Sequence, residues 1–176
     1  GLDMAKKEIA KKRQVVIVEG YTDVMAAHLA GITTAVATCG TAFGDDHIRV
    51  IRRLLMDDDA FRGEVIFTFD GDAAGQRAQT RALERILPLL EPGRSVRLAV
   101  LPEGKDPDDL IAASGPEGFR KLIGTARSLV DSLWEQTQAE FDIRQPEARA
   151  QFWQAVRGHV RSIGNNQVRS AYGDEI

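Results

Sequence analysis

Three short apolar runs, each followed by acidic residues, constrain the fold of this chain more than any other feature. The runs are Val15–Val18, Val65–Phe69 and Val96–Leu101. The acids that follow them are Glu19, then Asp70 and Asp72, then, after a short loop, Asp106 and Asp108. Such runs are typical of strands buried on both faces of a parallel sheet. Because open α/β sheets hold their ligands at the carboxyl ends of the strands, we expect these acids to meet at one edge.

The pattern between and after these runs predicts the rest of the architecture. Helical patterns separate the runs, and a further strand is expected at 32–38, so the order is β-α-β-α-β-α-β. From Pro116 no strand pattern appears, and apolar residues recur at helical spacing. We predict an α/β fold with a mainly parallel sheet flanked by helices and a C-terminal all-helical subdomain. The predicted domains are a basic lead-in helix at 1–14, a metal-binding catalytic domain at 15–115 and a truncated helical bundle at 116–176.

Composition excludes several classes of protein. The 176 residues include no apolar run long enough to span a bilayer and no signal-peptide pattern, so we expect a cytoplasmic protein without a membrane partner. A single cysteine, Cys39, excludes an internal disulfide framework and a cysteine-built zinc site. The net charge of -3 gives no bulk attraction to nucleic acid, which would need local patches or metal ions. The start at Gly1 and the end within a helical pattern suggest a fragment of a longer protein.

The acids suit a hard divalent cation. In Asp70-Gly71-Asp72, the two carboxylates point to the same side of an extended backbone, and the glycine between them allows an ion to approach. Ligands that are all oxygen favour Mg²⁺ or Mn²⁺. Glu19, Asp106 and Asp108 add further negative charge, so two or more ions are easier to justify than one. The run Asp57–Asp59 follows a helix instead of a strand, and we interpret it as a solvated loop.

Paired ions predict chemistry at phosphorus. Two such metals can clamp the attacking and leaving oxygens of an in-line displacement, so we predict phosphoryl or nucleotidyl transfer, with Glu19, Asp70 and Asp72 as catalytic residues. The candidates for contacts with nucleotide or DNA phosphates are Lys11, Lys12, Arg77 and Lys105. For the lysines of the first fourteen residues two interpretations stay open: a solvated lead-in helix, or a basic stretch that faces phosphates at the acidic edge.

Four ordered segments resemble a known family. They are Glu19-Gly20-Tyr21-Thr22-Asp23, Cys39-Gly40-Thr41-Ala42, Asp70-Gly71-Asp72-Ala73-Ala74-Gly75 and Gly104-Lys105-Asp106-Pro107-Asp108. Together these segments are similar to the motifs of the Toprim domain in bacterial DnaG-type DNA primases. The similarity spans about residues 9 to 115, and the helical tail resembles the bundle that follows Toprim in those primases.

The resemblance implies a DNA-dependent RNA polymerase that copies a single-stranded DNA template into short RNA primers from ribonucleoside triphosphates. It implies metal ligation by Asp70, Asp72, Asp106 and Asp108, and a role for Glu19 as metal ligand or general acid/base. Structural or supporting roles fall to Gly20, Asp23, Gly71 and Gly75, and Asp23 and Asp109 are candidate helix caps. The family's zinc-binding domain, its N-terminal polymerase subdomain and its helicase-binding domain have no counterpart here. The fragment alone is therefore expected to be incomplete for primer synthesis.

Two other functions remain open at this stage. A Toprim domain can also serve DNA strand cleavage, as in topoisomerases and nucleases, but a topoisomerase needs a nucleophilic tyrosine. The chain offers only Tyr21, inside the first motif, and Tyr172, near its end. A receiver-like signalling module shares the α/β pattern and the acidic pocket, although the Asp-Gly-Asp spacing and the helical tail fit it poorly.

Overall fold

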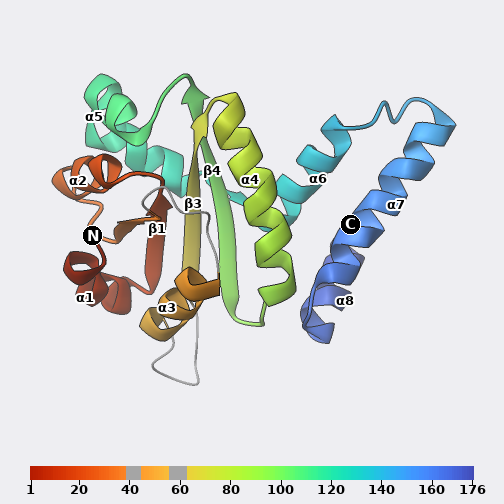
Figure 1. Cartoon of the computed structure of the whole chain (residues 1–176), viewed down its shortest axis with the longest axis horizontal. Helices are drawn as coiled ribbons and strands as arrows, with labels where there is room; N and C mark the ends of the chain where they lie inside the picture. Colours follow the sequence, from red (N-terminus) through yellow and green to blue (C-terminus); the bar gives the residue numbers. More distant parts are fainter. Residues whose placement is uncertain (39–44, 56–62) are drawn as a thin grey trace. The chain divides into compact units, whose positions relative to one another are not determined.

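The structure, a computed structural model, describes residues 1–38, 45–55 and 63–176 (Figure 1). Its strands are β1 (Gln14–Val18), β2 (Ala35–Ala37), β3 (Gly63–Gly71), β4 (Arg94–Glu103) and β5 (Arg127–Ser128). Its helices are α1 (Leu2–Lys12), α2 (Tyr21–Leu29), α3 (Asp45–Leu55), α4 (Ala73–Ile86), α5 (Pro107–Gly124), α6 (Leu129–Ala139), α7 (Pro146–Ser162) and α8 (Asn166–Glu175), with a short 3₁₀ helix, η1 (Leu87–Leu89). The predicted segments Cys39-Gly40-Thr41-Ala42 and Asp57–Asp59 lie outside the described residues.

The strands form a five-stranded sheet in the order β2-β1-β3-β4-β5. The pairings of β1 with β2, β1 with β3 and β3 with β4 are all parallel, as predicted. Between Phe69 and Gly71 the register of β3 against β4 shifts, at the point where the acidic segment begins. The two-residue strand β5 was not predicted, because Arg127 and Ser128 carry no apolar pattern.

Burial explains why β1 lies inside the sheet. All four residues of the run Val15–Val18 are buried. Val16 and Val18 belong to one core cluster with residues of α2 and α5, two helices that contact each other (Figure 1). Ile17 lines a pocket with Val50 and Ile51 of α3, on the other face of the sheet. Alternate side chains thus serve opposite faces, as the period of two in a strand requires.

The chain packs as two compact units, residues 1–79 with 93–127 and residues 80–92 with 128–176. In the second unit α7 contacts α6, α8 and η1. Helix α5 runs through Pro116, where the sequence pattern changes, with a break at Gly115 (φ 68°, ψ 179°). Beyond the break, Phe119 and Ile123 complete the core cluster of the first unit. The boundaries of these two packing units differ from those of the predicted domains at 1–14, 15–115 and 116–176. The domain ranges describe functional segments and stay predictions.

We expect Gly75→Ala to destabilise the first unit. Gly75 lies in the first turn of α4, and a Cβ atom built on it would lie 2.1 Å from the carbonyl oxygen of Asp70. Relief of this clash would require the main chain of α4 or that of β3 at Asp70 to move, so the free energy of unfolding should fall by about 2 kcal/mol or more. The measurement is urea unfolding followed by circular dichroism.

Gly124→Ala is the matched control for this substitution. Gly124 is a helical glycine of the same unit, and a Cβ atom added there meets nothing within 4 Å. It should be neutral or stabilising by up to about 1 kcal/mol, the difference in helix propensity between alanine and glycine. Equal effects of the two substitutions would contradict the close packing of α4 on Asp70.

Candidate metal and catalytic site

The acidic edge lies at the point where the order of the sheet reverses. Strand β2 lies on one side of β1 and β3 on the other, so a crevice is expected beyond the carboxyl ends of β1 and β3. Glu19 directly follows β1, and Asp70 is the second-last residue of β3. The main-chain N–H of Asp70 donates a hydrogen bond to the Glu19 carboxylate. The first two predicted acids therefore meet at the switch point of the fold.

Gly71 joins the third acidic segment to this edge. Its carbonyl oxygen accepts a hydrogen bond from the N–H of Gly104 (3.2 Å), and its own N–H donates to the carbonyl of Lys105 (3.4 Å). A Cβ atom at Gly71 would lie 2.1 Å from the carbonyl oxygen of Pro102, so any side chain would push the loop away. Gly104 has a φ of 70°, which favours glycine. These contacts hold the residue before Asp106 against the end of β3.

Three of the acids also cap helices. Asp72 Oδ1 accepts the N–H of Gly75 at the start of α4 (2.7 Å), and Asp106 Oδ1 accepts the N–H of Asp109 at the start of α5 (2.7 Å). The buried carboxylate of Asp23 accepts the N–H of Gly20 at the start of α2 (2.8 Å). Each of these bonds satisfies a main-chain donor that has no partner inside its helix.

The capping role of Asp23 agrees with the sequence, whereas that of Asp109 needs correction. Asp109 supplies the donor N–H, and Asp106 is the cap of α5. The signal was present in the sequence, because an aspartate directly before a proline is typical of a helix that starts with proline at its first position. The caps formed by Asp72 and Asp106 leave the second oxygen of each carboxylate for another ligand.

Burial and mutual repulsion raise the pKa values of carboxylates at the acidic edge. Burial raises the pKa of Asp70 to about 6, and the negative charges of Glu19, Asp23, Asp106 and Asp72 contribute to this rise. Burial also raises the pKa of Glu19, with smaller contributions from Asp72 and Asp23, while the hydrogen bond from the backbone of Asp70 opposes the rise.

The pKa of Asp23 is raised as well, by burial and then by the charges of Asp106 and Asp108. Each of the five predicted ligands and Asp23 thus takes part in at least one of these interactions between carboxylates. The structure brings all six acids into one electrostatic neighbourhood.

The donor chemistry fits a hard cation, although the ligands are not closed around one position. Within residues 1–38, 45–55 and 63–176, no group of three or more His, Cys, Asp or Glu side chains is arranged to hold an ion. Asp72 and Asp106 each use one oxygen as a helix cap, and repulsion between like charges opposes a tighter arrangement of the carboxylates. The residues that would hold Mg²⁺ or Mn²⁺ are Glu19, Asp70, Asp72, Asp106 and Asp108, all oxygen donors.

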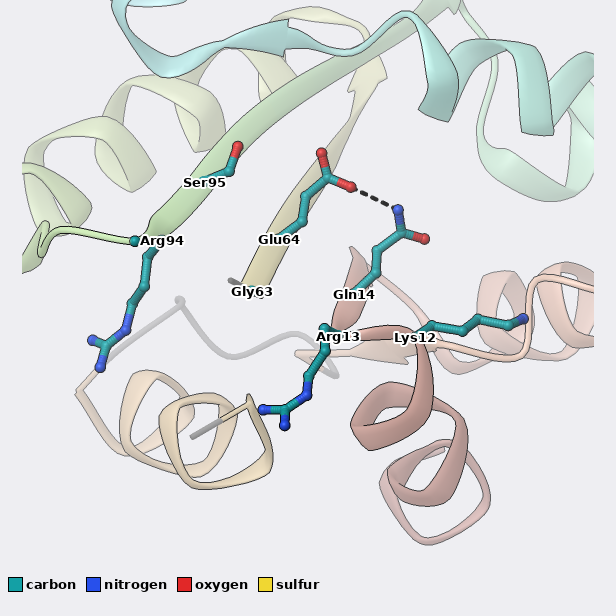
Figure 2. A pocket seen from close by; sticks show the side chains of 8 residues that line it. Lys12, Arg13, Gln14, Gly63, Glu64, Arg94 and Ser95 are labelled. Carbon is teal, nitrogen blue, oxygen red and sulfur yellow. Dashed lines mark hydrogen bonds between the residues drawn. The ribbon is translucent and has the colours of Figure 1, made fainter. Parts of the chain in front are cut away.

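The predicted phosphate contacts fall into two groups. Arg77 is exposed on α4, five residues after Asp72, and Lys105 directly precedes Asp106, so both belong to the acidic edge. Lys11 and Lys12 do not, because α1 delivers them to the amino end of β1. Figure 2 shows Lys12 in a surface pocket with the first residues of β1, β3 and β4.

The distance along β1 decides between the two interpretations of the basic lead-in. Five residues of extended strand span about 16 Å, so Lys12 cannot reach the phosphates of a substrate bound beside Glu19. Lys12 instead contacts Glu8 (3.5 Å) and Thr33 (3.4 Å). The structure therefore favours the solvated lead-in helix.

Among the residues that the structure describes, no helix combines the length and the apolar character needed to cross a membrane.

Comparison with known proteins identifies the family. Residues 13–99 match the model of the Toprim domain. A DNA primase of Mycolicibacterium smegmatis is 50% identical over 176 residues, which are 100% of this chain and 27% of that protein. A crystal structure of a DNA primase domain from Pseudomonas aeruginosa superimposes with a TM-score of 0.88 at 36% identity, covering 99% of this chain and 52% of that one.

A structure of the DnaG primase catalytic domain bound to single-stranded DNA matches with a TM-score of 0.83 at 33% identity, over 97% of this chain and 53% of that one. The chain thus spans about a quarter of the full-length relative and about half of the solved domains. The sheet order alone is shared with receiver-like folds and does not discriminate between the functions left open. The matches do discriminate, and the chain belongs to the family of bacterial DnaG-type DNA primases, of which it spans the Toprim domain and the helical segment that follows.

Proposed function

We propose that this chain is the metal-binding catalytic segment of a DNA-dependent RNA polymerase that makes short RNA primers on single-stranded DNA. The observation that carries the proposal is the convergence of Glu19, Asp70 and Asp106 from three separate strand ends at the switch point of the sheet. Family membership supplies the reaction class, a nucleotidyl transfer. The proposal includes a cytoplasmic setting, because the relatives are bacterial replication enzymes.

The cofactor in this proposal is Mg²⁺ or Mn²⁺, in two or more ions. When bound, the metal neutralises charge on the transferred phosphoryl group and lowers the barrier to attack. The chain's own residues would hold the ions: Glu19, Asp70 and Asp72 at the ends of β1 and β3, and Asp106 and Asp108 at the start of α5. Arg77 and Lys105 are the cations available at this edge for the phosphates of a ribonucleoside triphosphate or a strand.

The partners in this proposal are the DNA template, ribonucleoside triphosphates and the RNA primer. One neighbouring structure is of a primase catalytic domain bound to single-stranded DNA, which supports the template. The solved domains are about twice as long as this chain, so primer synthesis should need segments that it lacks. A replicative helicase, and zinc in a separate domain, would also be bound outside it.

Asp70→Asn and Asp72→Asn should each reduce primer synthesis by the full-length protein at least about 100-fold. Each removes a negative charge that would hold an ion, and a catalytic metal supplies several kcal/mol of barrier lowering. The measurement is incorporation of labelled ribonucleotides on a single-stranded template. Asp3→Asn, which removes a fully exposed carboxylate on α1, is the matched control and should leave the rate unchanged. Retained synthesis in both site variants would contradict the assignment.

Asp70→Asn should stabilise the metal-free chain at pH 7.5. The pKa of Asp70 is raised to about 6 in the folded state, so between pH 4 and 6 the folded chain binds more protons than the unfolded chain. Its contribution to stability is therefore greatest below about pH 4 and falls as the pH rises through 6. Because the carboxylate is partly exposed, we expect a gain on the order of 1 kcal/mol in the variant.

Thermal unfolding in EDTA between pH 4.5 and 8 checks this prediction. The melting temperature of the native chain should fall more steeply with pH than that of Asp70→Asn, while Asp3→Asn should follow the native chain. Added Mn²⁺ should raise the melting temperature of the native chain and raise that of Asp70→Asn less, because binding to the folded state alone stabilises it. Parallel curves for all three proteins would show that the pKa of Asp70 is not raised in the folded state.

A further inference from the structure

Helix α7 carries an exposed stripe of cations and one aromatic ring. Its members are spaced four residues apart and are all exposed: Arg149, Trp153, Arg157 and Arg161. Four residues advance about 6 Å along a helix and overshoot one full turn by about 40°, so neighbouring members lie close together, and the stripe winds about a third of the way around α7 between Arg149 and Arg161. The sequence of the C-terminal region has balanced charge overall, but α7 has three arginines against one acid, Glu147.

Two neighbouring aromatic rings hold the ring of Trp153 in place. It makes T-shaped contacts with Trp134 (centroids 5.7 Å apart) and with Phe152 (5.4 Å), and Phe152 is buried. Trp153 nevertheless keeps 36% of its surface exposed. A large aromatic ring that two neighbours already hold in place, and that is open to solvent, loses little further conformational freedom when it binds a flat ligand.

A groove between α7 and α8 runs beside this ring. It is lined by Trp153, Val156, Arg157, Val160 and Arg161 from α7, by Gly173 from α8 and by Ile176, which follows α8. The charged side chains that line it are both arginines; Asp174 and Glu175 follow Gly173 on α8 but do not line it. The groove thus combines an apolar floor with positive charge on one wall.

Among the residues that the structure describes, nothing forms an ion pair with the arginines of the stripe. Arg149, Arg157 and Arg161 form no ion pair with any residue in the described part of the chain. Arg144, by contrast, is also exposed and lies in the same unit, but it donates to the carboxylate of Asp142 (2.7 Å). The stripe is therefore available to an anionic partner.

We propose that this face of α7 binds single-stranded nucleic acid, with a base stacked on Trp153 and backbone phosphates on Arg149, Arg157 and Arg161. A guanidinium recognises phosphate by paired hydrogen bonds, and every base has a face that stacks on an aromatic ring. The exposed ring of Trp153 lies between cations on both sides, which suits a base stacked between two backbone phosphates. The residues proposed to contact the strand all lie on α7 and do not depend on the metal site, so the surface goes beyond the proposed function.

The first test measures binding of a fluorescent oligodeoxythymidylate to the chain in EDTA, by polarisation, over a range of salt concentrations. Single-stranded binding loses about 0.7 units of log K per log unit of salt for each phosphate contact. The double variant Arg157→Gln with Arg161→Gln should bind about tenfold or more weakly and lower the salt slope by about 1.4. Arg144→Gln, with Asp142 left in place, is the control for an exposed arginine off the stripe and should change neither quantity by as much.

The second test reads the stacking directly. The chain has two tryptophans, so in a Trp134→Phe background the tryptophan emission comes from Trp153 alone. Oligodeoxythymidylate should quench this emission. In the native background, Trp153→Phe should retain most of the affinity for the oligonucleotide, whereas Trp153→Ala should lower that affinity at least about fivefold. An oligouridylate titration distinguishes RNA from DNA as the preferred strand.

Three outcomes would overturn the proposal. They are equal effects of the stripe variants and Arg144→Gln, no quenching of Trp153 by either oligonucleotide, and binding that disappears in EDTA or in Asp70→Asn. The last would assign all nucleic-acid contact to the acidic edge and leave α7 as a solvated face. Failure of the metal site in the tests above would leave the α7 results unchanged, so the two proposals fail separately.

Discussion

Repulsion between carboxylates is the interaction that the rest of the first unit must overcome. Glu19, Asp70 and Asp106 come from three separate segments, and the charges of Glu19 and Asp106 both add to the rise in the pKa of Asp70 that burial causes. Two unit charges about 4 Å apart repel by about 1 kcal/mol even in water, and by more where burial limits hydration. The buried strand β1 and the core that it shares with α2 and α5 supply the stability that holds these acids together without a cation. A site that destabilises its own fold is typical of function, since packing alone would favour neutral residues.

Two glycines convert this packing into a defined site. Gly75 lets α4 approach the main chain of Asp70, and Gly71 lets the loop before Asp106 lie against β3. Neither glycine is required by its φ value; each is required by what a side chain would strike. The Asp-Gly-Asp spacing therefore has a structural cause in addition to a chemical one. The first carboxylate stays on the strand, the glycine accepts the loop, and the second carboxylate begins the helix.

The sequence predicted the strands and the acidic edge because both follow from short-range patterns. A run such as Val15–Val18 can only be buried on both faces, and parallel strands bring their carboxyl ends to one edge. It also contained the sign that Lys12 lies away from Glu19, because a residue just before a strand lies at the amino end of that strand and the acids lie at the carboxyl end. It did not show that Phe119 packs with the sheet, since helical spacing identifies an apolar face but not the partner of that face.

The helix starts at the acidic edge explain how so much negative charge is tolerated near the crevice. Asp72 and Asp106 each lie at the first turn of a helix, where main-chain N–H groups and the helix dipole favour an anion. Asp70 lies on the strand β3, and its pKa is raised to about 6. The positive ends of α4 and α5 thus stabilise the outer acids, whereas Asp70 has no such helix start. A cation bound at this edge would therefore lower the electrostatic cost of the ionised Asp70 carboxylate most. Metal binding and folding stability are thus most closely linked through this residue.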